Sequence, residues 1–309
     1  MGALLVSRTA LAPNVVLYEV EAPRIARKHK AGQFVIVRPL ATSERIPLTI
    51  ADSDAEKGTI TLVVQAVGKT TEEMATKVFE GDELVSVAGP LGNPTHLSLP
   101  GRGENELGTV VCVAGGIGAA PILPIAKAFR EAGHEVVTVL GARNQSLLIL
   151  EDRLAAASDR VIVTTDDGSR GRKGFVSEAL AGFVAERRLR GGEVDLVIAI
   201  GPAPMMRASA EVARSLAIPT LVSLNTIMVD GTGMCGGCRV TVGNAVKYVC
   251  VDGPEFDGAL VDWEALMRRQ AMYKTEEKES LERYKTACEM ERLEAMAEGE
   301  AENDKEACA

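Results

Sequence analysis

The chain has 309 residues, 46% of them apolar, and its 43 acidic side chains outnumber its 34 basic ones, which gives a net charge of −9. This length suits two domains and a small module better than a single core. The negative charge argues against a nucleic-acid partner. The lack of any apolar run of about 18 residues argues against a membrane span, and the N-terminus lacks a signal-peptide pattern. We therefore expect a cytoplasmic protein.

Short apolar, β-branched runs separated by turn residues fill the first hundred residues. They include NVVLYEVEAP, GQFVIVRP, GTITLVVQAVG and DELVSVAGPLG. One short helix, Thr71 to Phe79, is the only helical pattern among them, so we predict a closed antiparallel β-barrel domain at 1–100. Side chains fill the interior of so small a barrel, and a ligand must therefore bind on its outside or rim.

A first candidate ligand segment on this barrel is RIPLT. Arg45 can pair with a phosphate, Pro47 stiffens the backbone, and Thr49 offers a hydroxyl beside a flat ring. An arginine before a proline turn is also common as a plain solvated charge, so this segment is weak evidence by itself.

A second candidate segment, Gly68-Lys69-Thr70-Thr71, leads from a strand into a helix. Gly68 permits close approach of a ligand, and the free amides of a first helical turn suit a pyrophosphate. Capping of the helix by Thr70 or Thr71 is an equally good interpretation of the two hydroxyls.

Strands alternate with helices after a polar connector at 101–108, and this order predicts a parallel-sheet α/β domain at 101–225. The strand from Val110 to Ala114 leads into a glycine loop and then a helix to about Ala132. The loop supplies candidate nucleotide-binding residues: Gly115, Gly116, Gly118 and Pro121. Because a proline replaces the third glycine and no acidic residue ends the next strand, this is not the ordinary Rossmann fingerprint.

Further apolar strands of this domain end in polar or glycine-rich segments. These segments are Gly141-Ala142-Arg143, Thr165-Asp166-Asp167-Gly168, Gly201-Pro202-Ala203-Pro204-Met205-Met206 and Ser223-Leu224-Asn225. The carboxyl ends of parallel strands meet at one edge of the sheet, so we expect these segments to gather there and to form a nucleotide site.

The loop after Asn225 has the spacing of an iron–sulfur site. Cys235, Cys238 and Cys250 fill the last three places of the plant-type 2Fe-2S pattern, and Asp230, with four residues between it and Cys235, fills the first. A carboxylate is a harder and less electron-donating ligand than a thiolate, so the exchange should preserve the cluster and change its reduction potential.

Three alternatives stay open for this loop. It could hold structural zinc, although a lone distant third cysteine suits zinc poorly, or it could form a disulfide in an oxidising compartment. A third possibility is a genuine cluster beside which Asp230 is not itself a ligand, the fourth ligand being Cys112, Cys288 or Cys308.

We place the cysteine loop in a module at 226–262. The residues that follow it, at 263–309, are predicted to form a helical acidic tail. From Gln270 onward there are 12 acidic and 6 basic residues, so the tail carries most of the net charge. Its last part, EAMAEGEAENDKEACA, lacks an apolar stripe, and we expect it to be frayed or disordered.

Together these motifs resemble the ferredoxin-NADP reductase superfamily, in the branch with a C-terminal 2Fe-2S loop, over roughly residues 1–262. TDDGSRGRKGF and the Asp-plus-three-Cys pattern are similar to the small subunits of NADH-dependent reduced ferredoxin:NADP oxidoreductases, also known as sulfide dehydrogenases. Electron-transfer subunits of dihydroorotate dehydrogenase are related but carry four cysteines, so Asp230 is a departure from them.

The resemblance implies FAD, a 2Fe-2S cluster and NAD(H) as cofactors. It assigns the FAD pyrophosphate to Arg45 and Thr70, with Gly68, Lys69 and Thr71 nearby, and the isoalloxazine to Pro47, Leu48 and Thr49. It assigns the nicotinamide nucleotide to Gly115, Gly116, Gly118, Pro121, Gly201 and Met205, and its adenosine half to Arg143, Asp166, Asp167 and Gly168. The cluster would be held by Asp230, Cys235, Cys238 and Cys250, and no catalytic acid or base is expected.

The implied function is an iron–sulfur flavoprotein subunit that transfers electrons between NAD(H), FAD and the cluster inside a larger oxidoreductase, which in this branch can bifurcate electrons and be linked to ferredoxin and NADP. The expected partner is a larger flavin and iron–sulfur subunit, with ferredoxin an indirect one, and the helix from Trp263 onward is the expected packing arm unless it folds back on its own nucleotide domain. The alternative function is a non-catalytic electron-transfer subunit of a dihydroorotate dehydrogenase or another redox complex.

Arg143 could favour NADP, but Asp166 and Asp167 would repel its 2′-phosphate, so NAD(H) is our prediction.

Overall fold

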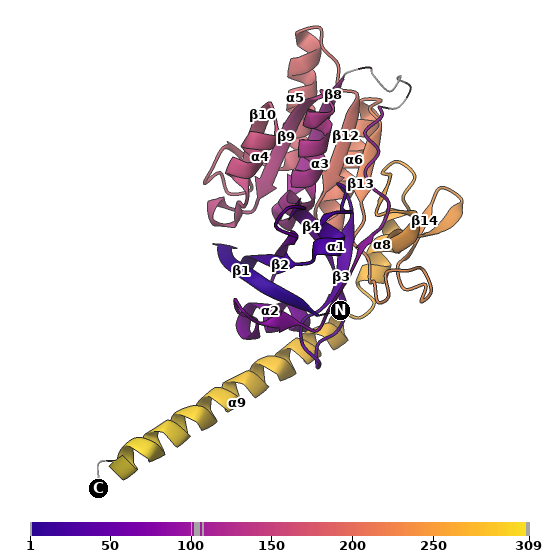
Figure 1. The fold of residues 1–309 in the computed structure, drawn as a ribbon. Coiled ribbons are helices and arrows are strands. Elements are labelled where there is room, and N and C mark those ends of the chain that lie inside the picture. The colour runs from indigo at the N-terminus through magenta and orange to yellow at the C-terminus, as the bar shows by residue number, and fades with distance from the viewer. Residues whose placement is uncertain (1, 100, 102–105, 107, 307–309) are drawn as a thin grey trace.

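The computed structural model of the chain describes residues 2–99, 101, 106 and 108–306. It contains two seven-stranded sheets and a two-stranded hairpin (Figure 1). The first sheet is antiparallel and the second is mainly parallel with helices on both faces, which confirms the fold class predicted from the sequence. The domain limits predicted from the sequence stay predictions, and the connector at 101–108 lies largely outside the described residues.

The first sheet curls back on itself as a barrel. Its strand order is β6-β1-β2-β5-β4-β3-β7, and the two end strands are separated in the chain by Val85 alone. The strands are β1 (Ala3–Ala12), β2 (Val15–Glu21), β3 (Phe34–Arg38), β4 (Ile46–Asp54), β5 (Thr59–Gln65), β6 (Glu83–Leu84) and β7 (Ser86–Leu91). Alternate side chains such as Tyr18, Ile60 and Leu62 fill the interior, as expected for a barrel of this size.

Two short helices accompany the barrel, α1 (Pro23–Ala26) and α2 (Lys69–Lys77). The sequence predicted α2 at Thr71 to Phe79, which begins two residues after its start in the structure. The helix begins at Lys69 because Gly68 already adopts the extended cap conformation. The sequence pattern gave no sign of α1, whose four residues are too few to show a helical period.

The second sheet has the order β11-β10-β9-β8-β12-β13-β16. Its strands are β8 (Thr109–Gly115), β9 (Glu135–Ala142), β10 (Arg160–Thr165), β11 (Arg172–Lys173), β12 (Leu196–Ile200), β13 (Thr220–Ser223) and the antiparallel edge strand β16 (Glu255–Asp257). Its helical segments are η1 (Gly116–Gly118), α3 (Ala119–Glu131), η2 (Gln145–Leu147), α4 (Glu151–Ala157), α5 (Val176–Leu189) and α6 (Ala203–Ser215).

The strands of this sheet are buried on both faces. Val110 and Cys112 point into the core under α3 and α4, whereas Val111 and Val113 point into the core under α5 and α6. The strand order reverses at β8, which lies between β9 and β12, and such a switch point leaves a crevice at the carboxyl ends of the strands. That crevice is the natural place for a nucleotide.

The C-terminal part returns to both preceding units. It comprises the hairpin β14 (Arg239–Val242) and β15 (Ala245–Tyr248), followed by α7 (Val249–Asp252), α8 (Trp263–Gln270) and α9 (Lys274–Glu306). α8 contacts α6 and β14, while α9 contacts α2 of the barrel and then projects away from the body of the molecule (Figure 1). The structure continues α9 as a helix to Glu306, where the sequence predicted a frayed end. Within the described part of the chain, no helix has the length and apolar character needed to cross a membrane.

Candidate cofactor sites and the cysteine loop

The RIPLT segment lies at the start of β4, on the barrel strand next to β3. Pro47 is paired with Ile36 and Thr49 with Phe34. Arg45 is exposed just before the strand, while the following positions through Thr49, Leu48 included, are half-buried. This half-exposed strand surface can accept a flat ring. It lies on the outside of the barrel, which is where the sequence analysis expects a ligand.

The second candidate segment forms the N-terminus of α2. The Thr71 hydroxyl accepts the backbone N–H groups of Val67 and Gly68, the latter at 2.9 Å, and donates to the Gly68 carbonyl. Capping is therefore the structural role of Thr71. Thr70 is different: its buried hydroxyl accepts the backbone N–H of Glu44 at 3.3 Å, and this contact brings Arg45 beside the helix start.

The surroundings of this helix start suit a pyrophosphate. The first-turn N–H groups of α2, at Lys69, Thr70 and Thr71, have no carbonyl partner inside the helix. Arg45 adds a guanidinium, which has no ion pair among the described residues. Amides of a helix N-terminus together with a nearby arginine form a good site for an anion, so the residues present fit the pyrophosphate of FAD.

The glycine loop and the GPAPMM segment meet at the switch point of the parallel sheet. A Cβ on Gly118 would lie 2.1 Å from the carbonyl oxygen of Ile200, and a Cβ on Gly115 would lie 2.3 Å from the Met205 sulfur. Gly116 has a φ of +56° and no atom within 4 Å of an added Cβ, whereas an added Cβ on Gly201 would lie 3.0 Å from Met205. These glycines let the loop and the N-terminus of α3 pack closely against the GPAPMM segment and leave room for a nucleotide. Pro121 lies half-buried in the first turn of α3.

The strand ends assigned to the adenosine half are also brought together. The backbone N–H of Asp166 donates to Ala142, and that of Asp167 donates to the Arg143 carbonyl at 3.3 Å. The Ser169 side chain is the first of the hydrogen-bond donors that hold the pKa of Asp167 below its usual range. Asp166, Asp167, Gly168 and Arg143 are all exposed, so they can face a ligand at this edge.

In the cysteine loop, two sulfur atoms already lie together. Cys238 and Cys250 are buried with their sulfur atoms 3.3 Å apart, whereas Cys235 is exposed. Burial raises the pKa of the Cys250 thiol, and the hydrogen bond shared with Cys238 adds to this rise. Thiolates in this place need a nearby cation to offset the cost of burial, and iron ions would supply that positive charge.

Asp230 organises the same loop from its other side. Its Oδ1 accepts the Thr232 N–H and its Oδ2 accepts the Cys235 N–H, both at 2.8 Å. The backbone donor of Thr232, followed by that of Cys235, holds the pKa of the Asp230 carboxyl below its usual range. The carboxylate is therefore ionised at neutral pH and sits beside the backbone of the exposed cysteine.

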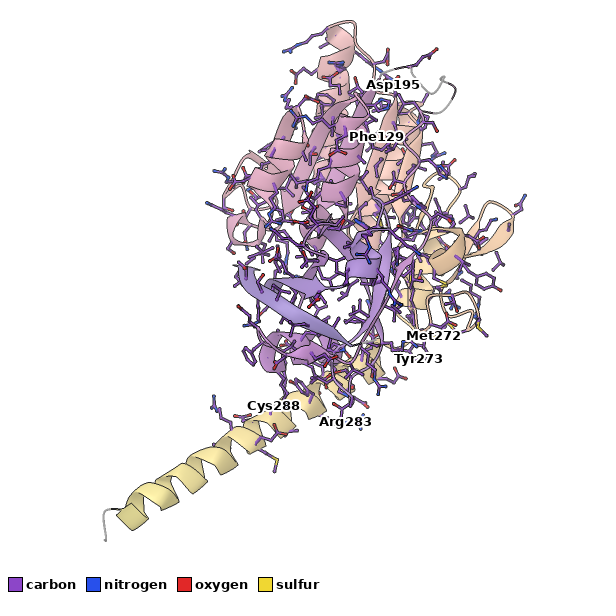
Figure 2. All side chains as sticks on the ribbon, in the orientation of Figure 1. Phe129, Asp195, Met272, Tyr273, Arg283 and Cys288 are labelled. Carbon is purple, nitrogen blue, oxygen red and sulfur yellow. The ribbon has the colours of Figure 1, made fainter. Side chains whose placement is uncertain are left out.

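Two of the three alternative fourth ligands lie away from the cysteine loop. Cys112 lies in β8 on the sheet face under α3, not in the core that contains Cys238 and Cys250. Cys288 lies on α9, near Lys77 and Tyr284 and away from the hairpin (Figures 1 and 2). Cys308 lies outside the described residues. All five cysteines that the structure describes are free thiols.

The donor set fits an iron–sulfur cluster by its chemistry, with three thiols and one ionised carboxylate in one loop. Over the described ranges, no three His, Cys, Asp or Glu side chains converge closely enough to hold a single metal ion. The ligand set predicted for the cluster accordingly stays a prediction.

The cysteine loop packs directly on the barrel. A Cβ on Gly231 would lie 2.7 Å from Leu91 and 2.8 Å from Ile36, so only a glycine permits this approach. Asn93, just after β7, donates its backbone N–H to Gly253 at 2.7 Å and its side-chain amide to Val251. The loop is thus fixed against β3, the neighbour of the RIPLT strand.

Sequence reasoning did not identify Asn93 or Glu255 as structurally important. Glu255, on β16, accepts the Thr95 hydroxyl at 2.6 Å, and burial raises the pKa of its carboxyl to about 7. The GPLGN run that precedes Thr95 was a signal that could have pointed to this junction, because glycines beside a strand end allow close approach of another segment.

Two known protein families match parts of this chain. The family described as an oxidoreductase NAD-binding domain matches residues 112–211, and the iron–sulfur cluster binding domain of dihydroorotate dehydrogenase B matches residues 225–262. The second match contains Asp230 and all three loop cysteines.

Relatives match over nearly the whole length. The chain is 46% identical to the dihydroorotate dehydrogenase B (NAD(+)) electron transfer subunit homolog of Thermotoga maritima, over 93% of this chain and 97% of that protein. It is 33% identical to the dihydroorotate dehydrogenase B (NAD(+)) electron transfer subunit of Desulforamulus reducens, over 82% of this chain and 95% of that one. The chain belongs to this family of electron-transfer subunits.

A solved structure supports the assignment. A chain from a study of flavin-based electron bifurcation, on the structure of an NADH-dependent reduced ferredoxin-NADP oxidoreductase, superposes with a TM-score of 0.82 at 43% identity and covers 91% of this chain and 97% of that one. The cytochrome b5 reductase domain of Ulva prolifera nitrate reductase, at 18% identity, 70% and 93% coverage and a TM-score of 0.56, shows the shared fold alone.

These matches confirm several sequence predictions for the subunit. It is an oxidoreductase subunit with an electron-transfer role, and its modules support FAD, a 2Fe-2S cluster and NAD(H) as cofactors. They do not test which side chains bind each cofactor.

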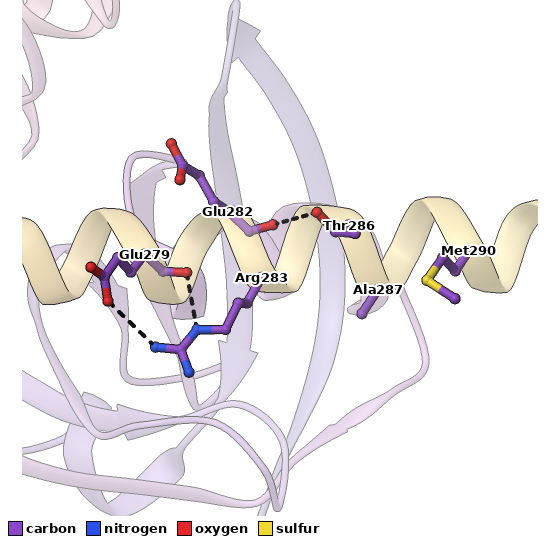
Figure 3. Close-up of a pocket in the computed structure, with 6 residues that line it drawn as sticks. All are labelled: Glu279, Glu282, Arg283, Thr286, Ala287 and Met290. Carbon is purple, nitrogen blue, oxygen red and sulfur yellow. Dashed lines mark hydrogen bonds and ion pairs between the residues drawn. The ribbon is translucent and has the colours of Figure 1, made fainter.

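One surface hollow of the subunit is unrelated to these sites. It lies along a single helix, α9, and is lined by Glu279, Glu282, Arg283, Thr286, Ala287 and Met290 (Figure 3). The Arg283–Glu279 pair and the bond from Thr286 to the Glu282 carbonyl are local to the helix. None of the predicted cofactor residues contributes to it.

Proposed function

We propose that this subunit oxidises NADH and delivers the electrons, through FAD on the barrel, to a 2Fe-2S cluster held by Asp230, Cys235, Cys238 and Cys250. Bound FAD supplies the conversion between the electron pair of NADH and the single electrons that a cluster carries. The chain supplies binding and alignment, and no side chain is needed as an acid or base.

The contact between the cysteine loop and the barrel carries the proposal. Gly231 touches Ile36 on β3, and Ile36 is paired with Pro47 on β4. The loop that contains the cluster ligands is therefore one strand away from the surface assigned to the isoalloxazine. Electron transfer between two cofactors needs this kind of proximity, and a rigid contact keeps their distance constant.

The nucleotide site supplies alignment from the other side. The first turn of α3 presents backbone N–H groups at the switch point of the sheet, where they suit the pyrophosphate of NADH. Asp166 and Asp167 beside Arg143 accept the hydroxyls of an unphosphorylated ribose and repel a 2′-phosphate, which favours NADH over NADPH.

Anaerobic addition of NADH to the purified holoprotein tests the proposal. The flavin absorbance should bleach first and the cluster absorbance should follow, with NADH giving the higher kcat/KM against NADPH. The double variant Asp166→Ser, Asp167→Ser should reduce that preference without changing the cluster content. A flavin that NADH leaves oxidised would contradict the proposal and favour a non-catalytic electron-transfer subunit.

The partner is proposed to be a larger flavin and iron–sulfur subunit, with ferredoxin as an indirect partner, in the cytoplasm. The relatives named as electron-transfer subunits support a partner in general, and the 43% identical oxidoreductase chain supports this kind of complex. Asp230 in place of a fourth cysteine favours this complex over a dihydroorotate dehydrogenase. The complex purified from its native source should reduce NADP with NADH and reduced ferredoxin, whereas oxidation of dihydroorotate would support the second assignment.

A further inference from the structure

Three buried polar side chains join the two flavin segments of the barrel. Ser43, Thr70 and Glu73 are each at most 4% exposed and lie beside the mainly apolar core of the barrel. Ser43 belongs to the turn that precedes Arg45, and Thr70 and Glu73 belong to α2. Burying a carboxylate is costly, so its presence at this place calls for a function beyond stability.

Ser43 is the centre of its turn. Its hydroxyl accepts the Leu40 N–H at 3.2 Å, and its backbone N–H donates back to the Leu40 carbonyl at 3.1 Å. The Arg38 guanidinium donates to the Ser43 carbonyl at 3.1 Å. The turn is therefore a rigid unit, and anything that holds the Ser43 side chain holds the whole turn.

Glu73 holds that side chain. Ser43 donates its hydroxyl hydrogen to Oε2 of Glu73 at 2.5 Å, while Oε1 lies 3.9 Å from the Lys69 ammonium. One residue further along, the Glu44 N–H donates to the Thr70 hydroxyl. Two contacts from consecutive residues of the turn thus end on the first two turns of α2.

We propose that Glu73 is a positioning residue for FAD: through Ser43 it locks the turn that carries Arg45 against the N-terminus of α2, so that the guanidinium and the helix amides bind one pyrophosphate together. The inference rests on the FAD placement in the proposed function. Glu73, at 3% exposed, acts through Ser43, and without it the remaining hydrogen bond that the described residues show between the two segments is the longer one from the Glu44 N–H to Thr70.

The rate at which FAD leaves the holoprotein, followed by the rise of free-flavin fluorescence, tests this role. Ser43→Ala and Glu73→Leu should each speed FAD release about three- to tenfold, the size expected for one buried hydrogen bond. Glu73→Gln keeps an acceptor for Ser43 and should restore most of the retention. The pair of changes together should be no worse than either alone, because both remove the same contact.

A matched control separates positioning from general loss of stability. The buried pair Thr138 and Ser158, whose oxygens are 2.7 Å apart, lies in the other sheet domain. Ser158→Ala removes a comparable buried hydrogen bond and should leave FAD release unchanged.

Arg45→Ala distinguishes the inference from the function on which it rests. If Arg45→Ala leaves FAD release unchanged, the proposed FAD placement fails. If Arg45→Ala speeds release but Ser43→Ala does not, the positioning role of Glu73 fails alone. In the Arg45→Ala background Ser43→Ala should add little, and a full additive effect would overturn the inference, because Ser43 would then act independently of Arg45.

Discussion

At the scale of single residues, we expect the properties of the cluster to depend on one atypical position. Asp230 occupies the first place of a ferredoxin spacing, and its ionised carboxylate already hydrogen-bonds to the Cys235 backbone. Asp230→Cys should keep the cluster and lower its reduction potential by on the order of 100 mV, because a thiolate donates more charge to iron. Redox titration followed by EPR measures the shift.

A control variant separates a ligand from a residue that only shapes the loop. Asp230→Asn keeps an oxygen that can accept one of the two backbone bonds but removes the charge. If Asp230 is a ligand, this variant should lose iron and sulfide. Full cluster content in Asp230→Asn, together with an unchanged potential in Asp230→Cys, would place Asp230 outside the ligand set.

Glu255 makes stability depend on pH. Burial raises the pKa of this carboxyl from 4.5 to about 7 in the folded chain. Between these values the folded state binds the proton more tightly than the unfolded state, so stability falls as the pH rises from about 4.5 to about 7. Glu255→Gln should flatten this decline and, above pH 7, raise stability by on the order of 1–3 kcal/mol.

The midpoint of thermal unfolding of the holoprotein, measured from pH 5 to pH 8, checks the prediction. Thr95→Val is the companion variant, because it removes the hydroxyl that donates to Glu255 and should steepen the decline. A Glu255→Gln variant with the same pH slope as the natural chain would assign that slope to other groups.

What the sequence could predict at this scale follows from covalent spacing. The distances along the chain between Asp230 and the cysteines are sequence properties, and so is the glycine loop at the end of β8. The Ser43–Glu73 and Asn93–Val251 contacts join residues 30 and 158 positions apart, and no local pattern marks such pairs. Glu255 likewise looked like one more acidic residue, because its burial depends on a barrel turn far away in the chain.

At the scale of elements, the strands were the most predictable. Their apolar, β-branched runs bounded by turn residues fix them locally, and the alternation of strands with helices fixes the parallel sheet. α9 was less predictable at its end, because its stability comes from charge pairs such as Lys278 with Glu282 and from contacts with α2, not from an apolar stripe. α8 packs on α6 of its own nucleotide domain, which was the alternative to a packing arm for the helix from Trp263 onward, and packing of the later helix on a partner stays a prediction.

α9 should support FAD retention through α2. Tyr284 hydrogen-bonds with Thr76 at 2.8 Å, and two ion pairs join the helices, Lys77 with Glu291 and Lys285 with Glu72. Exposed pairs of this kind contribute about 0–1 kcal/mol each, so truncation after Tyr273 should speed FAD release several-fold. The effect should shrink at high salt, because salt screens exposed charges.

The matched control is truncation after Leu293, which keeps every one of these contacts and should leave FAD release unchanged. Both truncated chains should keep full iron and sulfide, because the α9 contacts given above all reach α2 and none of them reaches the cysteine loop. Cluster loss in the shorter chain with normal FAD retention would contradict this role of α9. Co-purification of the chain ending at Leu293 with the larger subunit tests whether the projecting part of α9 binds the partner.

At the scale of the whole molecule, electron transfer depends on how three units are joined. The barrel contacts the parallel-sheet domain through Lys127 on α3, whose ammonium lies 2.6 Å from Asp52 on β4. The segment after the cysteines adds β16 to the edge of the parallel sheet, and the loop itself lies on β3 and β7. The cluster loop is therefore attached to both other units, which limits its freedom to move relative to a flavin on the barrel.

Gly231 is the position where this attachment can be tested. Its φ is +74°, and an added Cβ would lie 2.7 Å from Leu91 and 2.8 Å from Ile36, so Gly231→Ala must displace the loop or these two side chains and disturb the contact. Gly243→Ala is the matched control, because its φ is +59° in the same module but no atom lies within 4 Å of the added Cβ. Both variants carry similar backbone strain, of about 1–2 kcal/mol, and only one disturbs the contact.

In stopped-flow experiments with NADH, flavin bleaching should be equally fast in both, whereas reduction of the cluster should be slowed severalfold in Gly231→Ala alone. The rates are compared per loaded cluster, from iron and sulfide content, so that partial loss of the cluster does not imitate slower transfer. Equal cluster reduction in the two variants would show that the electrons do not depend on this contact between the loop and the barrel.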